Sequence, residues 1–188
     1  MTSSFVPPFH SARLVLRAIV AGDRDEHARL FSDPEVVRYL YDDVMTEAAL
    51  DEHFARRLWR GVPVEGTWCN LAVEHDGVFV GEVGLSQVSA AHRGYEIGYV
   101  FLPEFRGLGF ATEATRTLVD VAFKTLDAHR VVARLDARND DSRRLLERVG
   151  MRREAYFVQN EFVKGEWTDE IVFAVLEHEW APPHAPEN

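Results

Sequence analysis

The chain has 188 residues, of which 46% are hydrophobic, and this is enough for one domain with a sizeable core. Its 21 basic and 31 acidic residues give a net charge of −10, which argues against a nucleic acid partner and would attract cationic substrates, although acidity can serve solubility alone. The apolar runs are too short to cross a membrane, no leader pattern opens the chain and a lone cysteine excludes an internal disulfide, so we expect a cytoplasmic protein.

The residues before position 60 alternate between strand-like and helical periodicity. In order, they predict a loose arm, a strand, a helix, a short second helix and an amphipathic helix, at 1–10, 13–17, 24–31, 33–40 and 46–58. Asp23 can cap the first of these helices, Asp33 before Pro34 the second, and Thr46 the third. This part of the chain is therefore mainly helical.

From Thr67 the hydrophobic period changes to two, and strands dominate. Strands are predicted at 68–74, 79–88, 94–101, 130–137, 153–163 and 167–176, with helices through 111–122 and 140–149. The strand at 130–137 returns after a helix, so it should lie parallel to the strand that ends at Leu102. We expect one domain over 11–180 and a flexible tail at 181–188.

A glycine-containing loop separates the strand at 94–101 from the helix that follows. Pro103 stops the strand, and Gly107 and Gly109 precede the helical pattern. A helix start leaves N–H groups without partners and carries the positive end of the macrodipole, so the donors from Gly107 to Thr112 predict an anion site. The loop lacks the lysine of a P-loop and the last glycine of a dinucleotide fingerprint, which argues against both.

The hexapeptide Arg106-Gly107-Leu108-Gly109-Phe110-Ala111 is similar to the pyrophosphate loop of the GNAT acetyltransferases, Gln/Arg-x-x-Gly-x-Gly/Ala. The segments at 95–100, 111–114, 139–142 and 146–151 add to the likeness, which spans about 11–180 and resembles the RimJ/RimL-like branch. The resemblance implies a GNAT fold of the α+β (mixed α/β) class. This is a single domain with a twisted mixed sheet of about seven strands, helices on both sides and a splayed parallel strand pair.

The resemblance also implies acetyl-CoA (coenzyme A) as cosubstrate, while the eight scattered histidines show no ligand spacing and predict no metal. The loop would hold the pyrophosphate, and the edge of the strand at 99–101 would pair with the pantetheine amides. The implied cofactor-binding residues are Tyr99, Val100, Phe101, Arg106, Gly107, Leu108, Gly109, Phe110, Ala111, Thr112, Asn139 and Ser142.

Several of these residues have a purely structural alternative. The side chains at 99–101 can belong to the core, and Asn139-Asp-Asp-Ser142 can be a helix cap as well as a contact to the cofactor. Four arginines can meet the 3′-phosphate of the cofactor or form a solvated face: Arg138, Arg143, Arg144 and Arg148. Cys69 is expected to be a small buried residue rather than a nucleophile.

An amine that attacks a thioester must lose a proton, and the developing oxyanion needs a donor. Glu96 is the leading candidate for the base and Glu82, acting directly or through water, the second, against the alternative that both are ordinary strand residues. A backbone N–H at a strand bulge near Phe101 is the expected oxyanion donor. Many GNAT enzymes carry an acidic tyrosine where this chain has Leu146, so either Ser142 protonates the thiolate or the thiolate leaves unaided.

The acceptor is the part of the reaction that the sequence describes least. Residues 23–59 and the closing hairpin should wall the amine cleft, and nearby carboxylates could favour a cation or only face solvent. We expect an N-acetyltransferase that acts by direct transfer on a protein or peptide N-terminus. A small amine (aminoglycoside, polyamine or amino acid derivative) and a non-catalytic acyl-CoA sensor are the alternatives, and a homodimer is left open.

Overall fold

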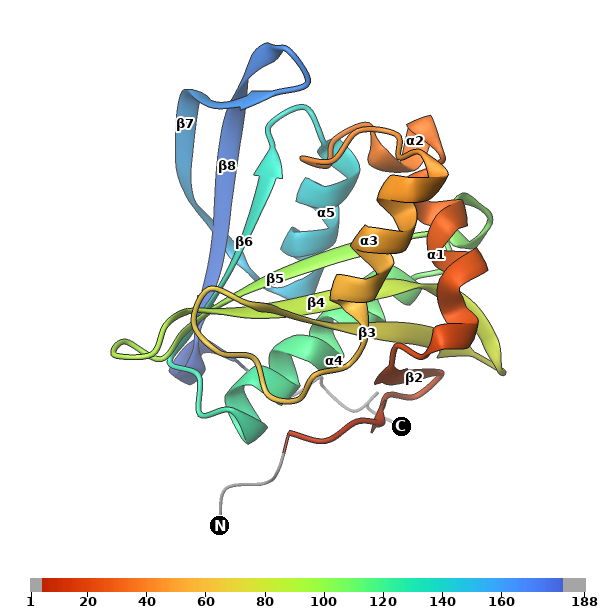
Figure 1. Cartoon of the computed structure of the whole chain (residues 1–188). Coiled ribbons are helices and arrows are strands. Elements are labelled where there is room, and N and C mark those ends of the chain that lie inside the picture. Colours follow the sequence, from red (N-terminus) through yellow and green to blue (C-terminus); the bar gives the residue numbers. More distant parts are fainter. Residues whose placement is uncertain (1–4, 181–188) are drawn as a thin grey trace.

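Alternating apolar residues build one eight-stranded sheet, seen in a computed structural model that describes residues 5–180 (Figure 1). The strand order is β1-β2-β3-β4-β5-β6-β8-β7, and all neighbours are antiparallel except β5 and β6. The strands are β1 (Phe9–His10), β2 (Leu14–Ala18), β3 (Trp68–His75), β4 (Val78–Ser89), β5 (Gly94–Phe101), β6 (Arg130–Asp136), β7 (Arg152–Val163) and β8 (Glu166–Leu176).

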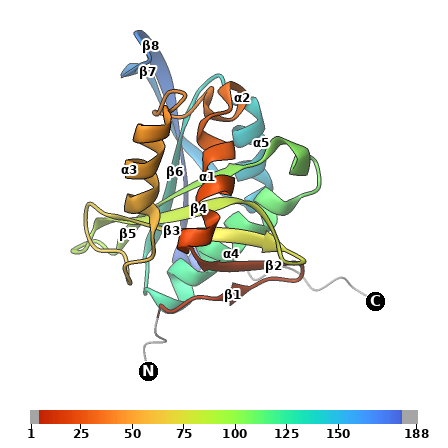
Figure 2. The same ribbon diagram turned by 45° about the vertical axis from the view of Figure 1, so that its right-hand side comes forward.

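Five α-helices cover the two faces of this sheet (Figures 1 and 2). They are α1 (Arg24–Phe31), α2 (Pro34–Val37), α3 (Glu47–Arg57), α4 (Phe110–Thr125) and α5 (Asp140–Val149). Helices α1 and α3 lie on one face, whereas α4 and α5 lie on the other. The mixed α/β GNAT fold with helices on both sides is therefore confirmed.

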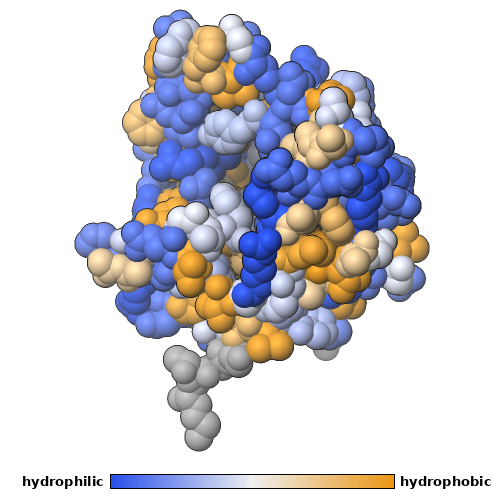
Figure 3. All heavy atoms as spheres, in the orientation of Figure 1, coloured by the Kyte–Doolittle hydropathy of each residue, from blue (hydrophilic) through white to orange (hydrophobic). Residues whose placement is uncertain are grey.

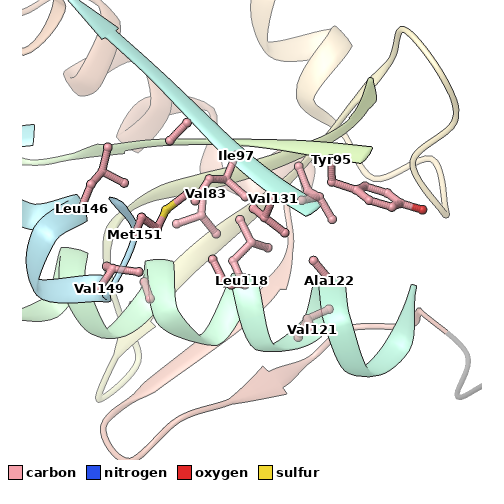
Figure 4. Close-up of a cluster of buried hydrophobic side chains, with 14 of the residues drawn as sticks. Val83, Tyr95, Ile97, Leu118, Val121, Ala122, Val131, Leu146, Val149 and Met151 are labelled. Carbon is pink, nitrogen blue, oxygen red and sulfur yellow. The ribbon is translucent and has the colours of Figure 1, made fainter. Parts of the chain in front are cut away.

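The larger core lies between the sheet and α4. Apolar residues at three- and four-residue spacing along α4 place Leu118, Val121 and Ala122 on the side that faces the sheet (Figure 4). They pack with Val83 and Val131 from the strands. This packing fixes α4 against β5, so the loop that precedes α4 is held next to the end of that strand.

The parallel strands β5 and β6 separate soon after they meet. They pair only over Gly94–Glu96 and Arg130–Val132. Beyond that point β5 continues to Phe101 with β4 alone, while β6 continues to Asp136 with β8 alone. The facing backbone groups of the two strands therefore have no strand partner, and the expected splayed pair is confirmed.

The structure differs from the sequence-based expectation at the start of the chain. Phe9 and His10 form β1, which pairs with β2 and brings the sheet to eight strands rather than about seven. Phe5 is buried against Phe9 and Trp59, so residues 5–10 are not the loose arm that we expected. This contact could not be predicted from the sequence, because the segment shows no strand or helix periodicity and its aromatic residues next to prolines resemble a linker. The predicted tail at 181–188 lies outside the described residues.

Candidate active site

The loop before α4 has the backbone of an anion site. Gly107 and Gly109 have positive φ angles of 77° and 80°, a conformation that glycine adopts without a steric penalty. Gly109 is the N-cap of α4, and no side chain caps the helix. The first helical bond runs from Glu113 N to Gly109 O at 3.0 Å, so the N–H groups of Phe110, Ala111 and Thr112 point out of the helix end. The predicted strand, turn and helix are thus present.

Arg13, in the turn between β1 and β2, was missed by sequence reasoning but holds this loop. Its guanidinium donates to Leu108 O at 3.1 Å, lies over the ring of Phe110 and pairs with Glu113 at 2.7 Å. Arg106, the first residue of the motif, instead approaches Glu35 at 3.6 Å. No local signal predicts the role of Arg13, because its partners lie about a hundred positions further along the chain.

A cavity of about 220 Å³ occupies the gap where β5 and β6 part. It brings together four predicted site residues: Glu96, Tyr99, Asn139 and Ser142. Asn139 is the N-cap of α5, and its side-chain oxygen accepts from Ser142 N at 3.0 Å. The cap interpretation is therefore confirmed, and it leaves the side-chain NH₂ of Asn139 as a donor toward the cavity.

Tyr99 brings a hydroxyl group to the position where the sequence lacked one. Its hydroxyl lies 2.6 Å from Oγ of Ser142, and burial raises the pKa of Tyr99 above its ordinary value. Leu146, which replaces the family tyrosine, is fully buried in the core between α4 and the sheet (Figure 4). A hydroxyl group for this cavity therefore comes from Tyr99 and Ser142 and not from position 146.

Glu96 lies at the point where the two strands part. Its side chain is 21% exposed and lies 3.5 Å from Arg134 of β6, which also pairs with buried Glu170 at 3.1 Å. Burial raises the pKa of Glu96, and the charge of Arg134 offsets part of this effect. A carboxylate whose pKa is raised is better suited to accept a proton than an ordinary glutamate.

A second, larger cavity of about 810 Å³ lies on the α1 and α3 face of the sheet. It shares Trp68, Gly98 and Tyr99 with the smaller cavity, so the two meet at β5. The indole of Trp68 lies close to Gly84 and Gly98, where a Cβ atom would come within 3.1 and 3.4 Å of the ring. Because these two glycines have no side chain, the indole has space to lie between the two cavities.

The surface seen in Figure 3 carries a mixture of hydrophilic and apolar side chains. It is hollowed between the β7–β8 hairpin and the helices. The hairpin carries Phe162 and Trp167, which are 60% and 59% exposed and pack edge to face. These exposed aromatic side chains lie on the hairpin that the sequence placed beside the amine cleft.

Glu82 belongs to a buried polar cluster at the larger cavity. His27 Nδ1 lies 2.6 Å from Glu82 Oε1, and His27 Nε2 lies 2.9 Å from His53 Nδ1. Arg57 donates to Asn70 at 3.0 Å and to Glu82 at 3.3 Å, and reaches His53 Nε2 at 3.1 Å. Sequence reasoning found Glu82 but missed the histidines, because α1, α3 and β4 meet only in the folded chain.

Three secondary expectations need correction or refinement. No register shift separates β4 from β5 near Phe101; the shift lies at Gln87/Ser89, so the expected bulge is wrong. The arginines proposed for the 3′-phosphate are largely engaged by carboxylates: Arg138 with Asp136 and Glu166, Arg143 with Asp140 and Glu147, and Arg144 with Asp141. Burial raises the pKa of the Cys69 thiol to about 12, which agrees with a structural cysteine.

Between residues 5 and 180 no helix is long and apolar enough to cross a bilayer. The same part of the chain holds no group of three histidine, cysteine or acidic side chains arranged to bind a metal ion.

A helix start with free amides, parallel strands that part beside it and two cavities that meet at Gly98 of β5 are the features of an acyl-CoA-dependent transferase. The chain belongs to the GNAT acetyltransferase family, since the model of the acetyltransferase (GNAT) domain matches residues 13–152. It is accordingly a GNAT N-acetyltransferase, a fold that uses acetyl-CoA.

Individual proteins are similar to this chain in sequence or in fold. A GNAT-family acetyltransferase from Bacillus anthracis has a TM-score of 0.82 at 30% identity, over 92% of this chain and 99% of that one. The putative ribosomal N-acetyltransferase YdaF of Bacillus subtilis is 30% identical over 65% of this chain and 67% of its own length. Spermidine N-acetyltransferase from Vibrio cholerae, in complex with CoA and spermine, has a TM-score of 0.77 at 22% identity, over 90% and 98% of the chains.

Proposed function

We propose that this enzyme transfers an acetyl group from acetyl-CoA to the N-terminal amine of a protein or peptide, by direct attack in a ternary complex. The observation that carries the proposal is the separation of β5 and β6 after Glu96 and Val132, beside the uncapped start of α4. Pantetheine amides can pair with the backbone of the parted strands while the pyrophosphate binds the helix start. The thioester then reaches Gly98, where the two cavities meet.

The cofactor contacts follow from this geometry. Backbone donors from Gly107 to Thr112 bind the pyrophosphate, and the backbone at 99–101 pairs with the pantetheine arm. The side-chain amide of Asn139 supplies a further donor to the arm. Arg13 keeps the loop in place through Leu108 and does not need to touch the cofactor.

We assign the proton of the attacking amine to a carboxylate, with Glu96 as the leading base. Glu96 lies where the strands part, and burial raises its pKa. Glu82 lies on the same face of the sheet, since β4 residue 82 pairs with Val100 and β4 residue 86 with Glu96. Glu82 is fully buried and faces the larger cavity, so it acts there and not beside Ser142.

The departing thiolate is met by the hydroxyl pair of Tyr99 and Ser142. Their oxygens lie 2.6 Å apart on the α5 side of the gap. A tyrosine with a raised pKa stays neutral and remains a donor, and Ser142 can pass its proton to the sulfur while taking one from Tyr99. This arrangement supplies an acid without a tyrosine at position 146.

Two observations support a peptide acceptor and the RimJ/RimL-like branch. The cavity of about 810 Å³ meets the smaller cavity at Gly98, and Glu161 and Val163 of the β7–β8 hairpin line the smaller one, so the two together suit an extended chain. YdaF, which is 30% identical to this chain, is named a putative ribosomal N-acetyltransferase. The second candidate is a small polyamine, favoured by the carboxylates Glu96, Glu161 and Glu170 of the smaller cavity and by the name of the Vibrio cholerae structure.

Release of free thiol from acetyl-CoA tests the proposal. The panel contains peptides with N-terminal Ser or Ala, the same peptides with a blocked N-terminus, spermidine and a no-acceptor control. We expect turnover only with the unblocked peptides. Turnover on spermidine alone would move the assignment to small amines, and CoA binding without turnover on any amine would identify an acyl-CoA sensor.

A further inference from the structure

Of the polar cluster formed by His27, His53, Arg57 and Glu82, only Glu82 has a part in the acetyl transfer described so far. The exposed fraction of His27 is 0%, that of Glu82 is 1% and that of His53 is 6%. Such groups are costly to bury unless every donor and acceptor is paired. His53 and Glu82 both line the larger cavity, whereas His27 lies behind them and joins the two.

The contacts determine which nitrogen of each histidine carries a hydrogen. Arg57 can only donate, so His53 Nε2 accepts from it and His53 Nδ1 carries the hydrogen. His53 Nδ1 then donates to His27 Nε2, and His27 Nδ1 donates to the carboxylate of Glu82. All hydrogens of the chain therefore point toward Glu82.

We propose that His53 takes the proton from the acceptor amine and that His27 passes a proton on to Glu82. The proposal rests on the proposed N-acetyltransferase activity and names a second route for the amine proton beside Glu96. A proton enters at His53 Nε2, the hydrogen on His53 Nδ1 moves to His27 Nε2, and that on His27 Nδ1 moves to Glu82 Oε1. The amine is then free to form its bond to the acetyl carbon, and the negative charge of Glu82 is neutralised.

Arg57 must release His53 Nε2 when the acceptor arrives. It can do so without losing its other partners, since its second NH₂ group keeps Asn70 and Glu82. The cation–π contact with Phe31 also holds the guanidinium. The acceptor amine takes the place of one N–H group at the wall of the cavity.

The surroundings of His53 keep its lone pair available. The charged and titratable groups that face it are Arg56 and Arg57 of α3, His27 of α1, Glu82 of β4 and, at 3.8 Å, Asp42 of the preceding loop. Burial, followed by the charge of Arg57, lowers the pKa of His53 to about 3, so the ring is neutral at physiological pH. His53 does not store the proton, because the chain carries it to Glu82.

The variant His53→Asn tests the proposal. Asparagine places an amide near the position of Nδ1 and can still donate to His27, but it cannot relay a proton. We expect kcat to fall at neutral pH to the rate that the Glu96 route sustains alone, about twofold or more below wild type, with unchanged affinity for CoA. The deficit should shrink as the pH approaches the pKa of the acceptor amine, because a deprotonated amine needs no base. His92→Asn, an exposed histidine outside both cavities, is the matched control and should behave as wild type.

Other outcomes would overturn the inference while leaving the enzyme assignment intact. A deficit of the same factor at every pH would make His53 a structural residue, and a wild-type rate would remove it from the reaction. If His53→Asn does not fold, a proton inventory of wild-type turnover in mixtures of H₂O and D₂O decides. A curved plot is expected when several protons move together, and a straight line would contradict the chain. Absence of turnover in wild type would instead refute the proposed function.

Discussion

At the scale of single residues, position 109 must satisfy two conditions, one on its backbone conformation and one on the approach of the cofactor. Its φ of 80° favours a residue without a Cβ, and the loop must bring its amides close to a diphosphate. Asparagine and aspartate both tolerate this backbone and have the same shape, but only aspartate adds a negative charge. A Cβ there would lie 3.4 Å from Arg13 Nη2, whose charge is already engaged by Glu113.

We therefore predict that Gly109→Asp binds CoA at least about tenfold more weakly than Gly109→Asn, since one charge repulsion is worth about 1.4 kcal/mol or more in such a site. Calorimetric titration with CoA measures the difference. Equal affinities of the two variants would show that no phosphate lies near position 109.

Glu96 makes the rate of acetyl transfer depend on pH in a defined direction. Its pKa is raised by burial and lowered by Arg134, and a base must be unprotonated to act. We predict that kcat/KM falls on the acid side with a pKa above that of an ordinary glutamate. Arg134→Gln should move this limb to higher pH, because the lowering influence is lost, whereas Arg134→Lys should keep it close to wild type.

The pH profile of Glu96→Gln completes the comparison. The acid limb that belongs to Glu96 should be absent, and the remaining rate should reflect other bases. If the limb persists unchanged in Glu96→Gln, another group is responsible for it and Glu96 is not the base.

At the scale of elements, the turn from β2 into α1 depends on a buried ion pair. Arg17 of β2 holds both oxygens of Asp23 at 2.7 Å, and Val20 N donates to the same carboxylate at 2.8 Å. Burial alone would raise the pKa of Asp23, but these contacts outweigh it and the pKa is lowered. The sequence predicted Asp23 as a helix cap. Asp23 does stand at the N-cap position of α1, but its side chain makes no cap hydrogen bond and ties the helix to the sheet through Arg17.

Asp23→Asn should therefore reduce the free energy of unfolding by about 3 kcal/mol at neutral pH. A lowered pKa means that this contribution is present above the unfolded-state pKa of about 3.9 and is lost as the pH falls through the folded value. The gap between variant and wild type should close in acid. Asp25→Asn, whose side chain is 96% exposed, is the control and should change stability by less than about 0.5 kcal/mol. Urea denaturation at pH 7 and pH 3 gives the comparison, and a gap that does not depend on pH would contradict the ion pair.

Elements with strong local signals were predictable from the sequence, and their boundaries agree with the structure to within a few residues. The caps at Asp33 and Thr46 are examples, since both side chains accept a hydrogen bond from the first turn of their helix. The short strand β1 was not predictable, because two residues are too few to show a periodicity and the strand forms only through its pairing with β2. The register of β4 with β5 was likewise not predictable, because it depends on how the two strands pack in the folded chain. The predicted bulge near Phe101 was wrong.

At the scale of the whole molecule, the residues of the candidate site also fall into those that could be predicted from the sequence and those that could not. The glycine loop, Asn139 and Ser142 are contiguous motifs, so a sequence can reveal them. Arg13, His27 and His53 reach the site only through folding, since Arg13 lies 100 positions from Glu113 and His27 lies 26 positions from His53. Side chains that meet across three elements have no spacing to detect, and acidic residues were predicted more easily than the histidines that orient them.

The account depends on where acetyl-CoA binds, and amide hydrogen exchange with and without saturating CoA tests this most directly. We predict slower exchange in two segments, the unpaired edge of β5 at 98–101 and the start of α4 at 107–112, with little change in β2 and β3. Protection confined to other segments, or no protection despite measured binding, would contradict the placement of the cofactor between the parted strands.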